Sequence, residues 1–478
     1  MCKVAGIPKV GNMPFGQLVQ AQRQFLGPLL VQLPDKRLRE VAVLAIRGIL
    51  ASRSPLVTHM TRGLVREQRC QRPMARRLYR FLWNRRFDHH ALLEALYEIT
   101  RGIVERHPYD YLLVAIDPVN FEKPYTEKLE AVSTVMKSTP PGPKGEKRLT
   151  PGYPAITATI VNLPEPGITY ANWFSYREET FDSENKEIRA ALQTTRRLFP
   201  DQPLRFLGDA GLDDRKIFAW VREIGADFIV RVSHRERLVE IYNDRLDRWE
   251  TESLGDFADT VPRSCHWQVP FSHAHQVRRD EVDVGWFLLR LPDQPDRCLW
   301  ALVAEDTSLD RQIILITSVS ILDELSARTV YNEWRSRPQI EHTYRFDQER
   351  GLDVEDMQVH TLERMRRLFA LVLMATLFVY FIANIWPEPA VTWLLDLGGK
   401  LHLALHADGP YILLAGIGAV FLTAATLTFV ARFPFPGECM TCGRVTSRKN
   451  QTEADCSLTK GSNRTKASSL QVLGAASL

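Results

Sequence analysis

The feature that most constrains the fold is a regular alternation of short apolar runs and amphipathic stretches. Three apolar runs have the length of buried strands, and they are 111–117 (YLLVAID), 204–208 (LRFLG) and 227–233 (DFIVRVS). Two β-rich runs around the turn LPEPG predict a hairpin after the first strand. Amphipathic stretches over 184–199 and 213–225 predict helices on either side of the second strand. This order predicts an α/β fold with a mixed sheet and helices on its faces.

Two acidic residues stand at the ends of these strands. Asp117 ends the first apolar run, where Pro118 is expected to stop the strand, and Asp209 directly follows the run 204–208. Ligands and substrates of α/β proteins usually bind beyond the carboxyl ends of the strands. The sequence therefore predicts that both carboxylates lie at the functional edge of the sheet.

The N-terminal segment is helical in pattern and strongly basic. Residues 1–110 hold 19 Lys and Arg against 8 Asp and Glu, whereas the rest of the chain holds 42 against 49. An arginine-rich helix is often only a solvated surface, but arginine also binds phosphate groups through paired hydrogen bonds. The basic segment therefore favours a polyanion such as DNA as its partner. The candidate DNA-binding residues are Arg76, Arg77, Arg80, Arg85 and Arg86.

The later stretches differ in character. Residues after about 234 are β-rich and punctuated by Pro and Asp, and the chain becomes mostly helical again from Ile321. The predicted organisation is a helical DNA-binding domain at 1–110, an α/β core at 111–233 and 311–386, a β-rich insertion at 234–310, an apolar helical region at 387–436 and a disordered tail at 437–478.

Composition narrows the class of protein. The chain has 478 residues, of which 45% are hydrophobic and 25% are charged, as expected of a globular protein with two or three domains. The seven scattered cysteines do not suggest a disulfide framework, and the first thirty residues show no secretory signal. We therefore expect a cytoplasmic protein.

A zinc site is an alternative that the spacing does not favour. Cys265, His266, His273 and His275 fall within eleven residues, but their spacing matches no zinc finger or knuckle. The pair Cys439 and Cys442 lies in the predicted disordered tail.

Two apolar stretches approach the length of a membrane span. They are 368–386 and 411–431, and Arg364, Arg366 and Arg367 precede the first of them. A helix that is hydrophobic all round can equally be buried in a large protein. We expect burial for the first stretch, and for the second stretch both interpretations stay open.

A polar pattern surrounds Glu341. Trp334, Arg337, Glu341, Arg345 and Gln348 are spaced by three, four, four and three residues, which puts them on one stripe if the helix continues through Pro338. A salt-bridged surface helix would show the same pattern. The alternative is that Glu341 joins the other two acids. Three carboxylates in one place repel one another unless cations neutralise them, as two Mg²⁺ ions about 4 Å apart would.

With these residues the sequence resembles the DDE transposases of bacterial insertion sequences, in the subgroup with a β-rich insertion before the catalytic Glu. That subgroup has the signature Tyr-x2-Arg-x3-Glu-x6-Lys, to which Trp334-x2-Arg337-x3-Glu341-x6-Gln348 is similar. Trp stands in place of the tyrosine and Gln in place of the lysine. The resemblance includes AIDPVNFEKP around Asp117 and LGDAGLDDRKIF around Asp209. It spans about residues 35–386.

The resemblance implies a ribonuclease H-like catalytic core. In the family, three acids hold two Mg²⁺ ions, for which Mn²⁺ substitutes, and the implied metal ligands are Asp117, Asp209 and Glu341. Contacts with DNA phosphates are implied for Arg337, with Trp334, Gln348 and Arg345 as further candidates. The implied protein is a transposase that binds inverted repeats at element ends, cleaves DNA strands and joins them to target DNA. It would act as a homodimer in a paired-end complex and associate with the bacterial nucleoid.

Two other functions remain compatible with the sequence. A transposase-derived DNA-binding protein that no longer cuts would share every motif, and Gln348 is the residue that would set it apart. A membrane-anchored protein is the weaker alternative. Some family members also stack a tryptophan of the insertion on a flipped base, but Trp267, Trp286 and Trp300 are each explained more simply as core aromatics.

Overall fold

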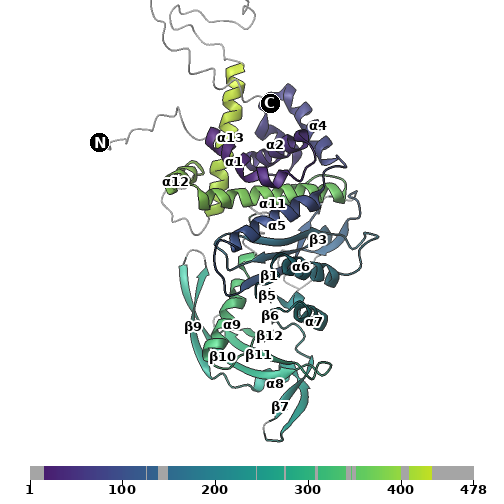
Figure 1. Cartoon of the computed structure of the whole chain (residues 1–478), viewed down its shortest axis with the longest axis vertical. Coiled ribbons are helices and arrows are strands. Elements are labelled where there is room, and N and C mark those ends of the chain that lie inside the picture. The colour runs from purple at the N-terminus through teal and green to yellow at the C-terminus, as the bar shows by residue number, and fades with distance from the viewer. Residues whose placement is uncertain are drawn as a thin grey trace, which may run out of the picture. The chain divides into compact units, whose positions relative to one another are not determined.

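A mixed β-sheet and the helices on its two faces make up the part of the chain that carries the predicted acids (Figure 1). The computed structural model describes residues 15–124, 126, 128–137, 149–243, 245–273, 276–306, 311–340, 346, 351–399 and 409–432. Contacts divide the chain into two units, Met1–Thr426 and Leu427–Leu478, and the fold described below belongs to the first.

Five helices precede the sheet. They are α1 (Phe15–Leu30), α2 (Lys36–Ser52), α3 (Val57–Leu64), α4 (Gln68–Leu82) and α5 (His89–Val104). Asp35 caps α2 by accepting a hydrogen bond from the Leu38 backbone N–H (2.9 Å), and Asp88 caps α5 in the same way. Pro73 lies inside α4, where its missing N–H removes one hydrogen bond near the start of the helix.

In the described residues, twelve strands share one sheet. They are β1 (Leu112–Glu122), β2 (Ser133–Met136), β3 (Leu149–Ile160), β4 (Gly167–Trp173), β5 (Leu204–Gly208), β6 (Asp227–Arg231), β7 (Leu238–Asn243), β8 (Arg248–Ser253), β9 (Cys265–His273), β10 (Gln276–Arg290), β11 (Cys298–Asp306) and β12 (Arg311–Thr317). The order is β2-β3-β1-β5-β6-β12-β11-β10-β7-β8, with β4 beside β3 and β9 beside β10. The strands predicted as an insertion therefore continue the same sheet.

Pro118 does not end the first strand as its position suggested. β1 continues to Glu122, and Pro118 pairs with Ile156 of the antiparallel strand β3. On the other side, the parallel strand β5 ends at Gly208, which pairs with Ile116. At Pro118, β1 therefore has a neighbouring strand on one side only. A strand tolerates proline at such a position, because no N–H is needed on the unpaired side.

The two faces of the sheet are covered by different helices. The remaining helices are α6 (Glu184–Leu198), η1 (Ala210–Leu212), α7 (Arg215–Glu223), α8 (Leu254–Thr260), α9 (Glu324–Ser336), η2 (Val354–Asp356), α11 (Leu362–Ile385), α12 (Glu388–Leu397) and α13 (Gly409–Arg432). Val114 and Ile116 of β1 are buried in the same core as residues of α5, α6, α7 and α11. Leu113 and Ala115 are buried with residues of α9 on the other face. This division follows from the alternation of side chains along a strand.

The apolar stretch after Arg367 is a buried helix. α11 runs between the N-terminal helices and the sheet (Figure 1), and the aliphatic residues along most of its length belong to the main core. In the described part of the chain, α11 has the length and mean hydropathy (2.4) of a membrane span, but 72% of its apolar window is buried inside the protein. Burial against α2 and α5 accounts for its hydrophobicity.

Candidate active site at the ends of three parallel strands

Three neighbouring parallel strands bring Asp117, Asp209 and Arg231 into one row. Ile116 of β1 pairs with Gly208 of β5, and Gly208 pairs with Val230 of β6. The next residue on each strand is therefore Asp117, Asp209 or Arg231. Two residues earlier, Ala115, Leu207 and Ile229 are all buried on the α9 face. Because side chains two residues apart point the same way, the row faces α9.

Arg337 lies between the two carboxylates. Its Nη1 is 3.5 Å from Asp117 Oδ1, and its Nη2 is 3.8 Å from Asp209 Oδ2. The side chain is 10% exposed, so the guanidinium sits in a largely water-excluded position where it compensates both negative charges. Asp117 and Asp209 are 92 positions apart in the sequence and meet at one cation, as predicted, although Asp117 lies inside β1 and only Asp209 follows the end of its strand.

The backbone at Arg337 places its side chain over the sheet. α9 ends at Ser336, Arg337 and Pro338 form a turn, and residues 339 and 340 begin a further helical turn. The helix is therefore not continuous through Pro338, which cannot donate the hydrogen bond that would continue α9. The single stripe from Trp334 to Gln348 that a continuous helix would give is interrupted at this point.

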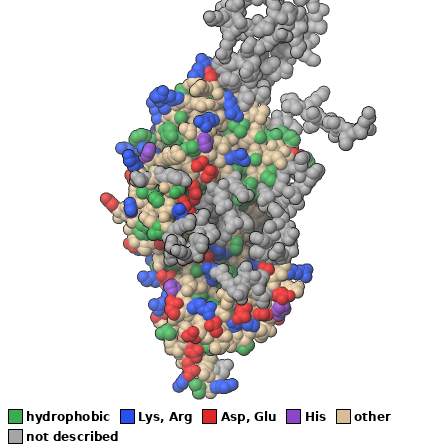
Figure 2. All heavy atoms as spheres, turned by 180° about the vertical axis from the view of Figure 1, so that it is seen from behind, with side chains coloured by type: hydrophobic (Ala, Val, Ile, Leu, Met, Phe, Trp, Pro, Cys, Tyr) green, Lys and Arg blue, Asp and Glu red, His purple; other side chains and the backbone are tan. Residues whose placement is uncertain are grey.

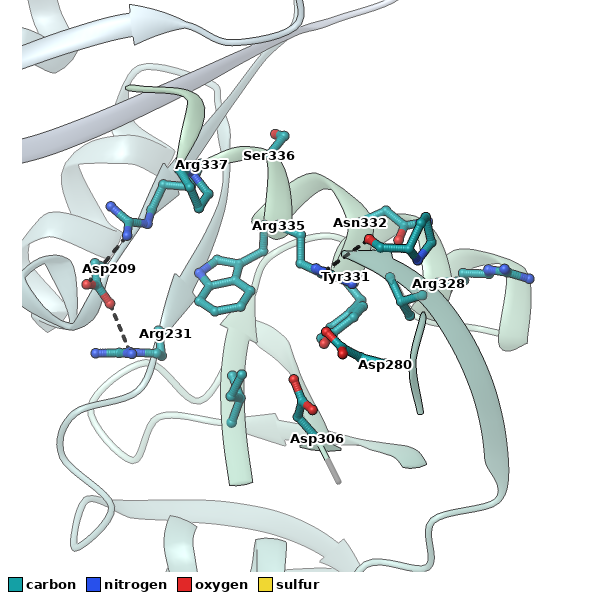
Figure 3. A pocket seen from close by; sticks show the side chains of 15 residues that line it. Asp209, Arg231, Asp280, Asp306, Arg328, Tyr331, Asn332, Arg335, Ser336 and Arg337 are labelled. Carbon is teal, nitrogen blue, oxygen red and sulfur yellow. Dashed lines mark hydrogen bonds and ion pairs between the residues drawn. The ribbon is translucent and has the colours of Figure 1, made fainter. Parts of the chain in front are cut away.

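Asp209 has a second arginine beside it. Arg231 Nε lies 2.8 Å from Asp209 Oδ1, and the backbone N–H of Ala210 donates to the same oxygen at 2.7 Å (Figure 3). Asp209 thereby also caps the short helix η1. Gly208 permits this tight turn, because a Cβ at this position would lie 2.8 Å from the Cβ of Leu212.

A buried polar cluster fixes the end of α9 against the sheet. Tyr111, just before β1, donates its hydroxyl proton to Glu333 Oε1 at 2.5 Å. Arg205 of β5 forms an ion pair with the other oxygen of Glu333, and its guanidinium lies 4.4 Å from the centroid of the Tyr111 ring. One residue later, Trp334 donates its indole N–H to the carbonyl oxygen of Gly208 (3.2 Å). These contacts set the position of Arg337.

The chain that follows Glu341 returns to the far end of β1. Lys123 is buried, and its Nζ donates to the carbonyl oxygens of Val354 (3.4 Å), Met357 (3.2 Å) and Glu355. Burial lowers the pKa of Lys123 to about 8. The described residues before and after Glu341 thus contact β1 or the residue that directly follows it.

A hollow opens beside the row of strand ends on the α9 face. It has a volume of about 680 Å³, and its wall includes Asp209, Arg231, Trp334 and Arg337 (Figure 3). Carboxylates suit a divalent cation, whereas the arginines suit an anionic oxygen. The site therefore offers ligands for both a metal ion and a phosphate group.

Three of the predicted site residues lie outside the described residues, and they are Glu341, Arg345 and Gln348. Among the residues that the structure does describe, no three His, Cys, Asp or Glu side chains form a group that could hold a metal. The pair Asp117 and Asp209 is thus the described part of the predicted acidic set.

Cys265, His266 and His273 of the β-rich stretch lie along β9. Cys265 and His273 stand at opposite ends of β9, and His266 pairs with Asp283 at 2.7 Å. His275, Cys439 and Cys442 lie outside the described residues. Trp267 is buried and donates its indole N–H to Glu324 (2.9 Å), as expected of a core aromatic.

The candidate DNA-binding arginines are all exposed and lie on α4 or just after it, and they are Arg76, Arg77, Arg80, Arg85 and Arg86. Trp83 on the same surface is 66% exposed, and the guanidinium of Arg364 lies 3.9 Å from the centroid of its ring. Arg86 forms an ion pair with Asp35 at 2.7 Å. Lys and Arg side chains gather over the N-terminal helices in the view from behind (Figure 2).

Comparison with known protein families finds a match over residues 176–378. The match is to the transposase DDE domain. This match supports the interpretation of the chain as a DDE transposase. The matched range includes Asp209, Arg337 and Glu341, whereas Asp117 lies upstream of it. No curated protein matches the chain.

Arg231 and the Glu333 cluster were missed from the sequence. Arg231 lies in the transposase domain match and ends the observed strand β6, but the predicted run continued to Ser233, so the sequence did not show Arg231 at a strand end. Tyr111, Arg205 and Glu333 carry no signal either, because each looks like an ordinary residue until the three meet in space.

Proposed function

We propose that this protein is a transposase that binds the ends of a mobile element, cleaves DNA strands in a metal-dependent reaction and transfers them to target DNA. The observation that carries the proposal is the meeting of Asp117 and Asp209 at the guanidinium of Arg337. The parallel strands β1 and β5 that present the two acids, with the antiparallel strand β3 beside them, fit a ribonuclease H-like core. The match of residues 176–378 to the transposase DDE domain supports the same function.

The acids fit a divalent metal site. Two carboxylates already converge on one positive group, and Mg²⁺ prefers carboxylate and water oxygens. Glu341 lies four residues after Arg337, which is about one helical turn or 6 Å of rise, and we propose it as the third ligand. Two bound Mg²⁺ ions, or Mn²⁺ in their place, would neutralise the charge that develops on the phosphate and activate a water molecule.

The chain's own residues would position the DNA. Arg337 would exchange its carboxylate partners for a phosphate oxygen next to the scissile bond, and Arg345 and Gln348 are proposed to contact the same backbone. Trp334 has its one donor engaged by Gly208, so a phosphate contact from Trp334 requires that bond to break. Water would attack the phosphorus and break its bond to the 3′ oxygen, which leaves a 3′-hydroxyl and a 5′-phosphate. The 3′-hydroxyl would then attack a phosphodiester of the target DNA, form a new P–O bond and displace a 3′-hydroxyl of the target strand.

The remaining parts of the proposal concern partners. The exposed arginines of α4 would bind the inverted repeats at the element ends through their phosphates. Two copies of the chain would hold two element ends together in a paired-end complex. The reaction would take place in the bacterial cytoplasm, on DNA of the nucleoid.

The direct test is a cleavage assay on a plasmid with the two inverted repeats that flank this protein's own gene. With Mg²⁺ or Mn²⁺, the wild-type protein should nick the repeat ends, and D117N, D209N and E341Q should each lose more than about 10³-fold in rate. D201N is the matched control, because Asp201 is exposed near the opposite end of β5. R337A should bind the repeats and cleave them about 10- to 100-fold more slowly. If R337A cleaved the DNA as fast as the wild-type protein, Arg337 would have no role in the cleavage site.

The same assay separates a DNA-binding protein that no longer cuts. Such a protein would shift the repeat DNA in a gel and leave it intact with either metal. Replacing Gln348 by lysine, the residue of the family signature, would then be the variant to examine for restored nicking. Nicking by the wild-type protein excludes this alternative.

A further inference from the structure

We infer that Arg231 is the resident counter-ion of Asp209 and that a divalent cation must displace it to use both oxygens of this carboxylate. The inference rests on the proposed metal-dependent function. It adds that the Arg231 guanidinium competes with the metal ion for Asp209. It assigns a role to a residue that ends β6 beside Asp209 and faces the hollow.

The occupancy of Asp209 Oδ1 carries the argument. This oxygen accepts the Ala210 backbone N–H at 2.7 Å and pairs with Arg231 Nε at 2.8 Å. The Ala210 bond uses one lone pair of this oxygen, and the Arg231 guanidinium occupies the space beside it as an ion-pair partner. The Ala210 bond is part of the η1 turn and is fixed by the backbone. A metal ion can therefore reach Oδ1 only when the Arg231 side chain leaves.

Arg231 differs from Arg337 in how it meets the acids. Arg337 approaches Asp117 and Asp209 at 3.5 and 3.8 Å, which leaves it beside both carboxylates without a close hydrogen bond to either. Arg231 forms a closer ion pair with Asp209, at 2.8 Å. Its side chain is 23% exposed, compared with 10% for Arg337, and it borders the hollow of about 680 Å³. The Arg231 side chain thus has space into which it can move.

The competition predicts in which direction the metal affinity changes when Arg231 is replaced. Removing the positive charge at 231 takes away the group that a cation must displace and the repulsion that the cation must overcome. The affinity of the site for a divalent cation should therefore rise when Arg231 loses its charge. If Arg231 instead held Asp209 in the orientation that metal binding needs, the same substitution would lower the affinity.

Mn²⁺ binding to the full-length protein measures this directly. Free Mn²⁺ is followed by electron paramagnetic resonance during titration of the wild type, R231Q, R231K and R215Q, without DNA. R231Q should bind Mn²⁺ about tenfold more tightly than the wild type, while R231K should stay close to it. R215Q is the matched control for a change of one charge, because Arg215 pairs with Asp293 away from the row, and it should leave the affinity unchanged.

Thermal unfolding gives a second readout. In the absence of metal, R231Q should unfold at a lower temperature than R215Q, because Asp209 loses its close partner. Added Mn²⁺ should then raise the unfolding temperature of R231Q by more than that of the wild type.

The outcomes distinguish the inference from the proposed function. Weaker or unchanged Mn²⁺ binding by R231Q, with binding by the wild type intact, overturns the role of Arg231 and leaves the metal-dependent function standing. Absence of Mn²⁺ binding in the wild type and in all variants overturns the metal-dependent function itself, and with it the competition.

Discussion

The indole N–H of Trp334 donates to the backbone carbonyl oxygen of Gly208, at 3.2 Å. Gly208 is the last residue of β5 and immediately precedes Asp209, while Trp334 lies three residues before Arg337. The bond therefore joins the end of α9 to the strand end that presents the second acid. It sets how far Arg337 stands from Asp209.

Replacing Trp334 by phenylalanine should separate this bond from the packing of the ring. The loss of one partly buried hydrogen bond should cost about 1 kcal/mol of unfolding free energy. Cleavage should fall severalfold, because Arg337 is less well placed, and repeat binding should stay unchanged. Urea unfolding and the nicking assay measure the two effects. W220F is the control, because Trp220 is a partly buried tryptophan of α7 on the opposite face of the sheet. Equal losses of activity in W334F and W220F would contradict the prediction.

Glu333 should be the most sensitive residue of the cluster behind the site. Its side chain is 7% exposed and that of Arg205 is 13% exposed, so E333Q leaves the Arg205 charge poorly compensated in a water-excluded place. We expect a loss of about 3 kcal/mol in the free energy of unfolding. In a double-mutant cycle with R205M, the combined loss should be clearly smaller than the sum of the single losses. Additive losses would show that the ion pair contributes little.

Asp353, twelve residues after Glu341, should make the stability of the protein depend on pH. Burial and the neighbouring Asp356 raise the pKa of Asp353 to about 6. Between about pH 4 and pH 6 the folded protein thus binds more protons than the unfolded chain, so Asp353 destabilises the fold as the pH rises through this window. D353N removes that cost, and asparagine tolerates the backbone φ of 51° at this position. The variant should gain about 1 kcal/mol at pH 7, after allowance for solvent screening, and little below pH 4.

Thermal unfolding across this pH range measures the effect. D201N serves as the control, because Asp201 is exposed. A gain for D353N that is the same at every pH would contradict the prediction, because a change independent of titration would have another cause.

The basic surface of α4 predicts a change in salt dependence. R76A and R80A should each weaken binding to repeat DNA, and each should reduce the slope of log K against log salt by about 0.9 if that arginine contacts one phosphate. K186A is the control, because Lys186 is exposed on α6 and pairs with Asp182. Fluorescence anisotropy at several salt concentrations gives the slopes. Slopes that do not differ from that of K186A would place the DNA contact elsewhere.

The sequence predicted what local patterns determine. The apolar runs located β5 and the start of β6, and the positions of Asp117 and Asp209 in or after such runs predicted their proximity. Local preference also accounts for the helix caps at Asp35 and Asp88, because aspartate side chains accept hydrogen bonds from the free backbone N–H groups of a helix start.

What the sequence could not predict depends on pairing between distant segments. Pro118 was expected to stop β1, but the strand continues because β3 pairs with it beyond the end of β5. The contact of Lys123 with the carbonyl oxygens near Val354 joins residues more than 200 positions apart, and no local pattern announces it. Whether a helix would continue through Pro338 was left open by the sequence, and Arg337 occupies a turn there.

The common direction of Asp117, Asp209 and Arg231 has a consequence for changes in chain length. The direction of each side chain depends on whether an even or an odd number of residues separates it from the buried part of its strand. Deleting one residue between Ala115 and Asp117 would turn the carboxylate toward α6 and α7, where no cation could reach it from the hollow. Inserting two residues at the same place would keep the direction of the Asp117 side chain but move it about 7 Å farther along the strand. This part of the protein should therefore tolerate exchanges of residue type far better than changes of residue number.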